Sequence, residues 1–193
     1  MKNLFLTLMA LIPFYADCQT ISINSFLGVN FGLCREEAVE ILKKEFAYFS
    51  FNEQQEMLLL YDWKFMGKTC KSVCLKFTDD RFYEGSAEFA STDIVGDFNM
   101  LKLKLVSNYG YGQDRCWFEP PYYLGDGREL TAVQTGNGKL FHYWSTQKSL
   151  KNGDFIVLES TANGTLRITF QNHFLASLAS EKYKQLTSNT SDY

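Results

Sequence analysis

The sequence contains few of the residues on which common catalytic and metal sites depend. It has 193 residues but only two histidines, His142 and His173. Two imidazoles are too few for most zinc sites unless carboxylates or thiolates complete the ligand set. The Cys-x-x-Cys, His-Glu-x-x-His, Gly-x-Ser-x-Gly, phosphate-loop and dinucleotide-binding motifs are all absent from the sequence. We therefore expect no cofactor, no metal ion and no catalytic residue. A Cys–His dyad is the alternative for the histidines, but no local motif supports it.

Positive charge is also scarce. Lysine and arginine total 19 against 22 aspartates and glutamates, so the net charge is −3 and the pI is about 5.5. The sequence has no run of basic residues, and this argues against a nucleic-acid partner.

The carboxylates show no arrangement typical of a glycosidase. Asp79 and Asp80 form a turn signal, and Glu84 and Glu88 alternate with other side chains as on a solvated sheet face. A glycosidase needs only a carboxylate pair, so a small hydrolase is our third and weakest hypothesis.

A single apolar run, residues 4–12, approaches the length of a targeting segment. It follows Lys2 and is broken by Pro13, which indicates a secretory signal peptide too short to span a membrane. Cleavage after Cys18 would leave Gln19 first, so we assign residues 1–18 to the signal peptide. We expect export to the periplasm or cell exterior. Lipid attachment at Cys18 is the alternative, and Asp17 before it argues against that. No second apolar run in the sequence approaches the length of a membrane span.

Five cysteines become four if Cys18 is removed with the signal peptide. Cys34, Cys70, Cys74 and Cys116 would then allow one or two disulfides in an oxidising compartment, with three full pairings. Cys70 and Cys74 cannot pair along one extended strand, because four residues separate their Cα atoms by ~13 Å and a disulfide allows ~7 Å. The alternative is that the four thiols are small buried side chains without disulfide partners.

Residues 26–49 contain the clearest amphipathic helix. An apolar stripe recurs at helical spacing, and the polar residues between its members face the other way. The stripe consists of Ala38, Ile41, Leu42, Phe46 and Phe49, and the polar side of Arg35, Glu36, Glu40, Lys43 and Lys44. Cys34 occupies the N-cap position, with Glu37 at the spacing of a capping box. We expect Leu42 and Phe46 to pack on the first strands, while Glu40 and Lys44 face water.

The start of this helix resembles a known group of domains. Residues 32–38, Gly-Leu-Cys-Arg-Glu-Glu-Ala, followed by Leu42, are similar to the helix start of β-lactamase-inhibitor-protein-like domains and the related small outer-membrane assembly lipoproteins. Residues 26–30 and 105–110 are also similar to segments of uncharacterised secreted proteins of that kind. The resemblance covers about a fifth of the chain. It implies helices packed on an antiparallel sheet and a non-catalytic role, and it assigns a function to no residue.

The remaining pattern predicts an α+β fold, with helices packed on antiparallel β-meanders. We expect residues 53–67 to form one strand or a bent pair of strands, and further strands at residues 72–78, 82–90, 139–145, 155–161 and 166–171. We also expect a helix capped by Asp97 that ends at Gly110, and a closing helix marked by Leu175, Leu178, Ala179 and Leu186. We expect Phe82, Glu84, Ser86, Glu88 and Ala90 to share one face of the third strand. Asn163-Gly164 between two strands predicts a two-residue type I′ turn with positive φ at both positions. This order suggests two similar halves, residues 19–110 and 111–193, with one continuous domain as the alternative.

The segment 111–128 is the longest expected loop and the one feature that suggests binding. The aromatic loop, residues 111–123, contains the five candidate binding residues Tyr111, Trp117, Phe118, Tyr122 and Tyr123. Such side chains anchor protein partners and stack on sugar rings. The alternative is that they fold back and cover the sheet. Our first hypothesis is an exported, non-enzymatic envelope protein that binds another envelope protein, and our second is a carbohydrate-binding module that uses this loop to hold a glycan.

Overall fold

The structure is a computed structural model that describes residues 22–45, 50–52, 56–61, 63–147, 150 and 152–189. The predicted signal peptide, and Phe46 and Phe49 of the first helix, lie outside the described residues. No helix in these ranges combines the length and apolar character that crossing a membrane requires.

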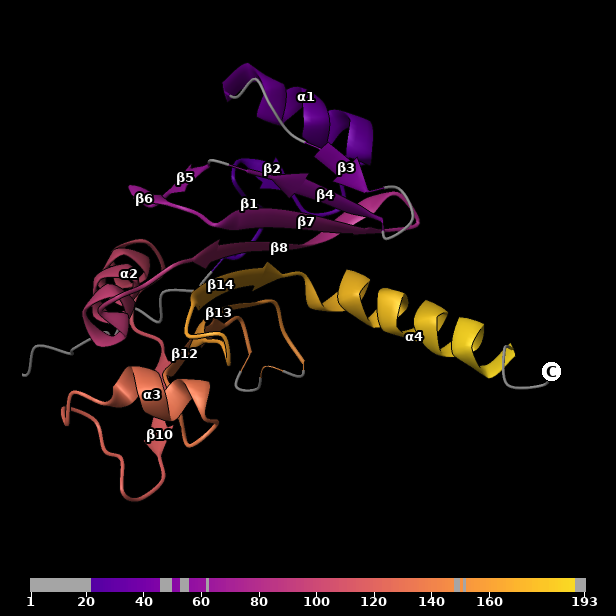
Figure 1. The fold of residues 1–193 in the computed structure, drawn as a ribbon. Helices are drawn as coiled ribbons and strands as arrows, with labels where there is room; N and C mark the ends of the chain where they lie inside the picture. The colour runs from indigo at the N-terminus through magenta and orange to yellow at the C-terminus, as the bar shows by residue number, and fades with distance from the viewer. Residues whose placement is uncertain are drawn as a thin grey trace, which may run out of the picture.

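An eight-stranded sheet forms the centre of the protein (Figure 1). Its strands lie in the order β3 (Ser50–Asn52), β4 (Met57–Leu60), β7 (Ser72–Thr78), β8 (Arg81–Phe89), β14 (Leu166–Gln171), β13 (Phe155–Ser160), β12 (Phe141–Ser145) and β9 (Gln113–Asp114). Every neighbouring pair is antiparallel. The pairing of β8 with β14 joins the two parts of the chain that we delimited in the sequence into one sheet. The α+β class is confirmed, and the similarity of the two halves stays a prediction.

Three small two-stranded sheets flank the large one. They are β1 (Ser25–Phe26) with β2 (Val29–Asn30), β5 (Lys64–Phe65) with β6 (Lys68–Thr69), and β10 (Trp117–Phe118) with β11 (Gly138–Lys139). The predicted strand region 53–67 includes β5, and the strand predicted at 139–145 begins at Lys139 of β11. The sequence pattern predicted none of the three pairings, because two-residue strands are too short to show an alternation of their own.

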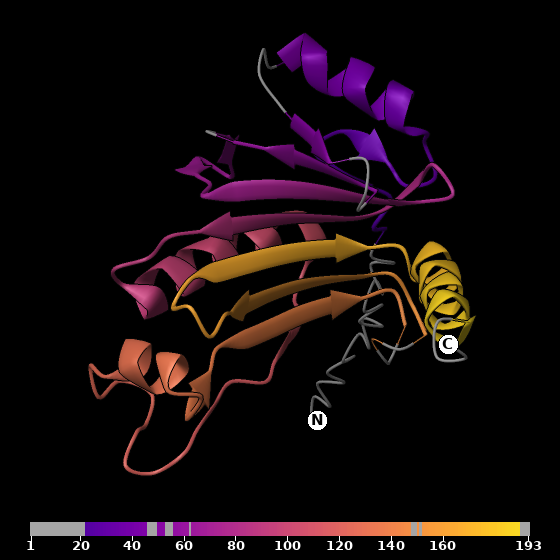
Figure 2. The same ribbon diagram turned by 45° about the vertical axis from the view of Figure 1, so that its right-hand side comes forward.

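The helices are α1 (Arg35–Glu45), α2 (Ile94–Tyr109), α3 (Glu129–Gln134) and α4 (His173–Asn189). The long helix α2 packs behind the sheet, α1 lies beside the first strands, and α4 lies at one end of the sheet (Figure 2). The side chains of Ala38 and Leu42 in α1 are buried, whereas Glu40 and Lys44 are exposed, as the periodicity predicted. At the start of α1 the backbone N–H of Cys34 donates to the Glu37 carboxylate at 3.0 Å, which is half of a capping box.

The core lies between the sheet and α2. Leu75 on β7, Ala87 on β8 and Ile168 on β14 are fully buried on the α2 side. Their neighbours on the opposite face include half-buried ion pairs, such as Lys76 with Glu84 at 2.7 Å. This two-sided pattern is what a sheet with one face on the core produces.

The prediction that Phe82 shares a face with Glu84 is wrong. Glu84 lies opposite Lys76, but Phe82 lies opposite Phe77, so β8 contains one extra residue, Tyr83, at this point. Such a β-bulge reverses the side-chain alternation on one side of it. Phe82 therefore points into the core and is completely buried.

The cap of the second helix is Asp93 rather than Asp97. The Asp93 carboxylate accepts a hydrogen bond from the N–H of Gly96 at 2.9 Å, which satisfies one of the free donors of the first turn. Asp97 lies in that first turn, and its carboxylate binds Lys68 and Ser91 instead. The helix ends at Gly110, with φ of 71°, as predicted.

The turn at Asn163-Gly164 is not type I′, because only Gly164 has a positive φ, of 73°. The N–H of Gly164 donates to the Thr161 carbonyl, and the N–H of Thr161 donates to the Thr165 carbonyl. This is a three-residue loop, a type I turn followed by a left-handed glycine. The longer loop removes the need for a positive φ at Asn163.

All four cysteines among the described residues are free. Of the alternatives left open by the sequence, the structure therefore has the unpaired thiols, although Cys34, Cys74 and Cys116 are only partly buried. Cys70 is buried, and burial raises the pKa of its thiol to about 11.

Candidate functional site

The aromatic loop is fixed to the sheet at its base. β9, at the start of the loop, pairs with β12, and the N–H of Arg115 donates to the Phe141 carbonyl at 2.8 Å. Farther along, β10 pairs with β11. The segment expected to be irregular is therefore held at two points by backbone hydrogen bonds.

Three of the five candidate side chains project into solvent. Tyr111 is 92% exposed, Tyr123 is 64% exposed and Trp117 is 45% exposed. Leu124, the residue after Tyr123, is also exposed. Large apolar side chains at such exposures within one loop are candidates for contact with a partner.

The other two candidate side chains, Phe118 and Tyr122, pack against the protein. The Phe118 ring lies over Gly138, where an added Cβ would approach the ring to 2.4 Å. Tyr122 stacks under the Arg128 guanidinium, whose central carbon lies 5.2 Å from the ring centroid. The loop thus combines packed aromatic residues that fix its shape with exposed ones.

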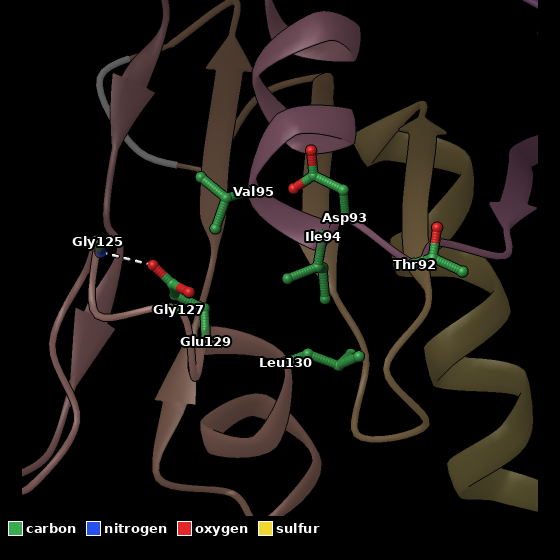
Figure 3. Close-up of a pocket in the computed structure, with 8 residues that line it drawn as sticks. All are labelled: Thr92, Asp93, Ile94, Val95, Gly125, Gly127, Glu129 and Leu130. Atoms are coloured by element: carbon green, nitrogen blue, oxygen red, sulfur yellow. Dashed lines mark hydrogen bonds between the residues drawn. The ribbon is translucent and has the colours of Figure 1, made fainter.

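A cavity of about 340 Å³ lies at the end of the loop, where the start of α2 meets α3 (Figure 3). It is lined by Thr92, Asp93, Ile94, Val95, Gly125, Gly127, Glu129 and Leu130. Glu129 is 7% exposed and accepts a hydrogen bond from the N–H of Gly125 at 2.5 Å. Asp93 caps α2, so both carboxylates of the lining bind backbone N–H groups. The cavity therefore offers carboxylate oxygens beside aliphatic walls.

A charged cluster of Lys102, Asp114 and His142 lies beneath the base of the loop. The Nζ of Lys102, on α2, is 2.6 Å from one Asp114 oxygen and 2.8 Å from the other. The Nδ1 of His142, on β12, is 2.6 Å from the Asp114 Oδ1. Because an ionised carboxylate can only accept, Nδ1 carries a proton. Nε2, which is buried, has no hydrogen-bond partner among the described residues.

The pKa values of Asp114 and His142 are both shifted downward. Burial lowers the pKa of His142, and the hydrogen bond with Asp114, which would raise it, does not compensate. Burial raises the pKa of Asp114, but the hydrogen bonds from Lys102 and His142 outweigh this and bring it below the ordinary value. His142 is therefore a neutral imidazole at pH 7 beside an ionised carboxylate.

The carboxylates considered for a glycosidase do not converge. Asp79 and Asp80 form the β7–β8 turn, both with positive φ, whereas Glu84 and Glu88 are held in ion pairs on the sheet. His173 is the first residue of α4. Within the part of the chain that the structure describes, no group of three or more His, Cys, Asp or Glu residues is placed to hold a metal ion.

Sequence reasoning missed the partnership of His142 and Asp114. The two residues lie 28 positions apart and meet only because β9 pairs with β12. No local pattern marks a two-residue strand inside an aromatic segment. The cavity was missed for a similar reason, since α3 has six residues and was not predicted.

Comparisons with protein-family models, with curated proteins and with solved structures find no match to this chain. The resemblance to β-lactamase-inhibitor-protein-like domains therefore stays a prediction.

Proposed function

We propose that this protein is an exported, non-enzymatic protein of the cell envelope that binds another envelope protein through the aromatic loop. The single observation that carries the proposal is the exposure of Tyr111, Trp117 and Tyr123 on a loop held at two points by strand pairing. Exposed aromatic residues on a fixed backbone bind with little loss of conformational entropy. Tyr and Trp are also the residues most enriched among binding hot spots.

The charge of the protein fits this proposal better than a nucleic-acid partner. The net charge of −3 has the wrong sign for the attraction to phosphates on which nucleic-acid binding depends. The arrangement around the loop also supports binding over catalysis, because both carboxylates that line the cavity are engaged by backbone N–H groups.

The binding of a glycan is the second candidate function, and the cavity favours it. Gly125, which lines the cavity, lies two residues after the exposed Tyr123. A volume of about 340 Å³ falls at the lower end of the range for small-ligand sites. Carboxylates accept hydrogen bonds from hydroxyl groups, and an exposed ring could stack on a sugar.

A pull-down with a matched control tests the first function. The mature chain and two variants are immobilised and exposed to envelope extract. Tyr123→Ser combined with Trp117→Ser removes two exposed rings from the loop. Tyr183→Ser removes a ring of similar exposure, 69%, from α4. We expect a discrete partner to be retained by the wild type and by Tyr183→Ser, and lost at least tenfold by the loop variant. Equal capture by all three chains would contradict the proposal.

A glycan array run with the same three chains separates the two functions. Retention of a glycan by the wild type and the control but not by the loop variant, with no protein partner captured, would replace the first function with the second.

The export part of the proposal has its own test. N-terminal sequencing of secreted or periplasmic material should begin at or near Gln19. A mature pool that retains Met1 would contradict it.

A further inference from the structure

We propose that Lys102, Asp114 and His142 form a pH-sensitive latch that holds the base of the aromatic loop against the sheet and releases it in mild acid. That this release would affect partner binding rests on the function proposed above, whereas the latch itself does not.

The His142 ring is enclosed by the segment that begins the loop. Its side chain is 3% exposed. An added Cβ at Gly112 would lie 2.5 Å from the His142 Nε2 and 2.4 Å from the Tyr143 carbonyl oxygen, so only glycine fits there. The Trp144 ring lies 4.3 Å from the imidazole, measured between centroids, and its indole N–H donates to the Gly110 carbonyl at 2.7 Å. The backbone around Gly112 therefore covers Nε2, and its movement would expose Nε2 to water.

The charges that act on the imidazole come from two elements. Asp114 faces it from β9 and Lys102 from α2. On β13 the residue opposite His142 is Leu158, which is apolar and fully buried. Asp114 favours the imidazolium and Lys102 opposes it, while burial opposes it most. A second proton on His142 would therefore be a buried charge whose Nε2–H finds no acceptor in the part of the chain that the structure describes.

The strand that would open is short. β9 consists of two residues at the edge of the sheet, and within the described residues it pairs only with β12. Opening it would hydrate His142 and restore an ordinary pKa near 6.5. By linkage, acid then favours the open form. Between pH 7.5 and 5.0 the opening constant would rise by up to about thirtyfold if His142 in the closed form stays neutral.

Hydrogen exchange followed by NMR tests the latch in the full mature chain without any ligand. The amide of Arg115, which donates to Phe141, reports on the base of the loop, and the amides of β13 and β14 report on the sheet. We expect the protection factor of Arg115 to fall between fivefold and thirtyfold from pH 7.5 to 5.0, with β13 and β14 unchanged. An unchanged Arg115 would overturn the proposal, and so would an equal loss in all strands, which would be global unfolding.

Two variants link the effect to this cluster. His142→Phe keeps a ring but cannot titrate, so the pH dependence at Arg115 should vanish. Lys102→Met removes the cation that opposes protonation, so the NMR titration of the His142 ring should move to higher pH and the loop should open less steeply. If His142→Phe does not fold, the Arg115 exchange and the His142 titration of the wild type and of Lys102→Met test the latch. Because no partner takes part in the hydrogen-exchange experiment, a negative result there would not contradict partner binding in the pull-down. A negative pull-down would likewise not contradict the latch.

Discussion

At the scale of single residues, Gly164 combines a left-handed backbone conformation with close side-chain neighbours on α3. Its φ is 73°, and an added Cβ would lie 2.7 Å from the Gln134 amide nitrogen and 2.9 Å from a Leu130 methyl group. Gly164→Val should therefore lower the free energy of unfolding by about 2–4 kcal/mol, through backbone strain and overpacking against α3. Urea denaturation measures the change.

Gly136 provides the matched control for this substitution. Its φ is 77°, but an added Cβ would meet nothing within 4 Å. Gly136→Val should therefore show the backbone cost alone, about 1–2 kcal/mol. Equal losses for the two variants would show that the hairpin does not pack against α3 as described.

Cys70 should be nearly inert in the folded protein. Burial raises the pKa of its thiol to about 11, so about 0.1% of it is ionised at pH 8, compared with about a quarter of an unperturbed thiol. We expect a thiol reagent at pH 8 to modify Cys70 at least a hundredfold more slowly than a cysteine peptide, and at the peptide rate in urea. Titration of fewer than four thiols in the denatured mature chain would instead reveal a disulfide.

At the scale of elements, those that were predicted correctly have a periodicity of their own. α1, β7 and α2 show it in the burial of Leu42, Leu75 and Leu101. The errors occur where a tertiary partner decides. Tyr83 is an extra residue only relative to β7. The Asp97 carboxylate binds Lys68 and Ser91 and does not cap the helix. Capping patterns in the sequence cannot separate Asp93 from Asp97, because both stand before apolar residues of the same helix.

The two faces of α1 provide a test at this scale. Leu42 is 1% exposed and belongs to the core, whereas Lys44 is exposed. Leu42→Ala should cost about 2–5 kcal/mol of stability, because it leaves a cavity in the core. Lys44→Ala should cost less than about 0.5 kcal/mol, since substitutions of exposed side chains usually change stability little. Similar urea midpoints for the two variants would mean that α1 is not a core element.

At the scale of the whole molecule, the sequence predicted the class of fold and the loop that has exposed aromatic residues, but not the chemistry beneath that loop. Tyr111, Trp117 and Tyr123 could be identified as candidate binding residues because aromatic residues are concentrated in one segment. Asp114 could not be linked to His142, because their contact depends on which strand occupies the edge of the sheet. The composition of a segment is a local property, whereas the pairing of distant side chains follows only from the completed topology.

The stability of the whole molecule should fall in acid through its paired carboxylates. The pKa of Glu88 is below its ordinary value of 4.5, because hydrogen bonds from Thr165 and Arg167 outweigh the effect of burial. The pKa of Asp97 is likewise below 3.8, since Lys68 and Ser91 bind it more strongly than burial opposes it. In both cases the unfolded chain binds the proton more tightly. The stabilisation is thus complete above pH about 4.5 and is lost as the pH falls toward the folded-state pKa values.

Urea denaturation at a series of pH values, with and without Glu88→Gln, tests this assignment. The amide cannot ionise, so the variant should be less stable than the wild type by about 1–2 kcal/mol at pH 7, where it loses charged hydrogen bonds. The difference should shrink steadily below pH 4.5, because the wild-type carboxyl then becomes neutral as well. Glu181→Gln, at an exposed position on α4, should follow the wild-type curve at every pH. If the difference in unfolding free energy between Glu88→Gln and the wild type stayed constant down to pH 3, groups other than Glu88 would cause the acid sensitivity.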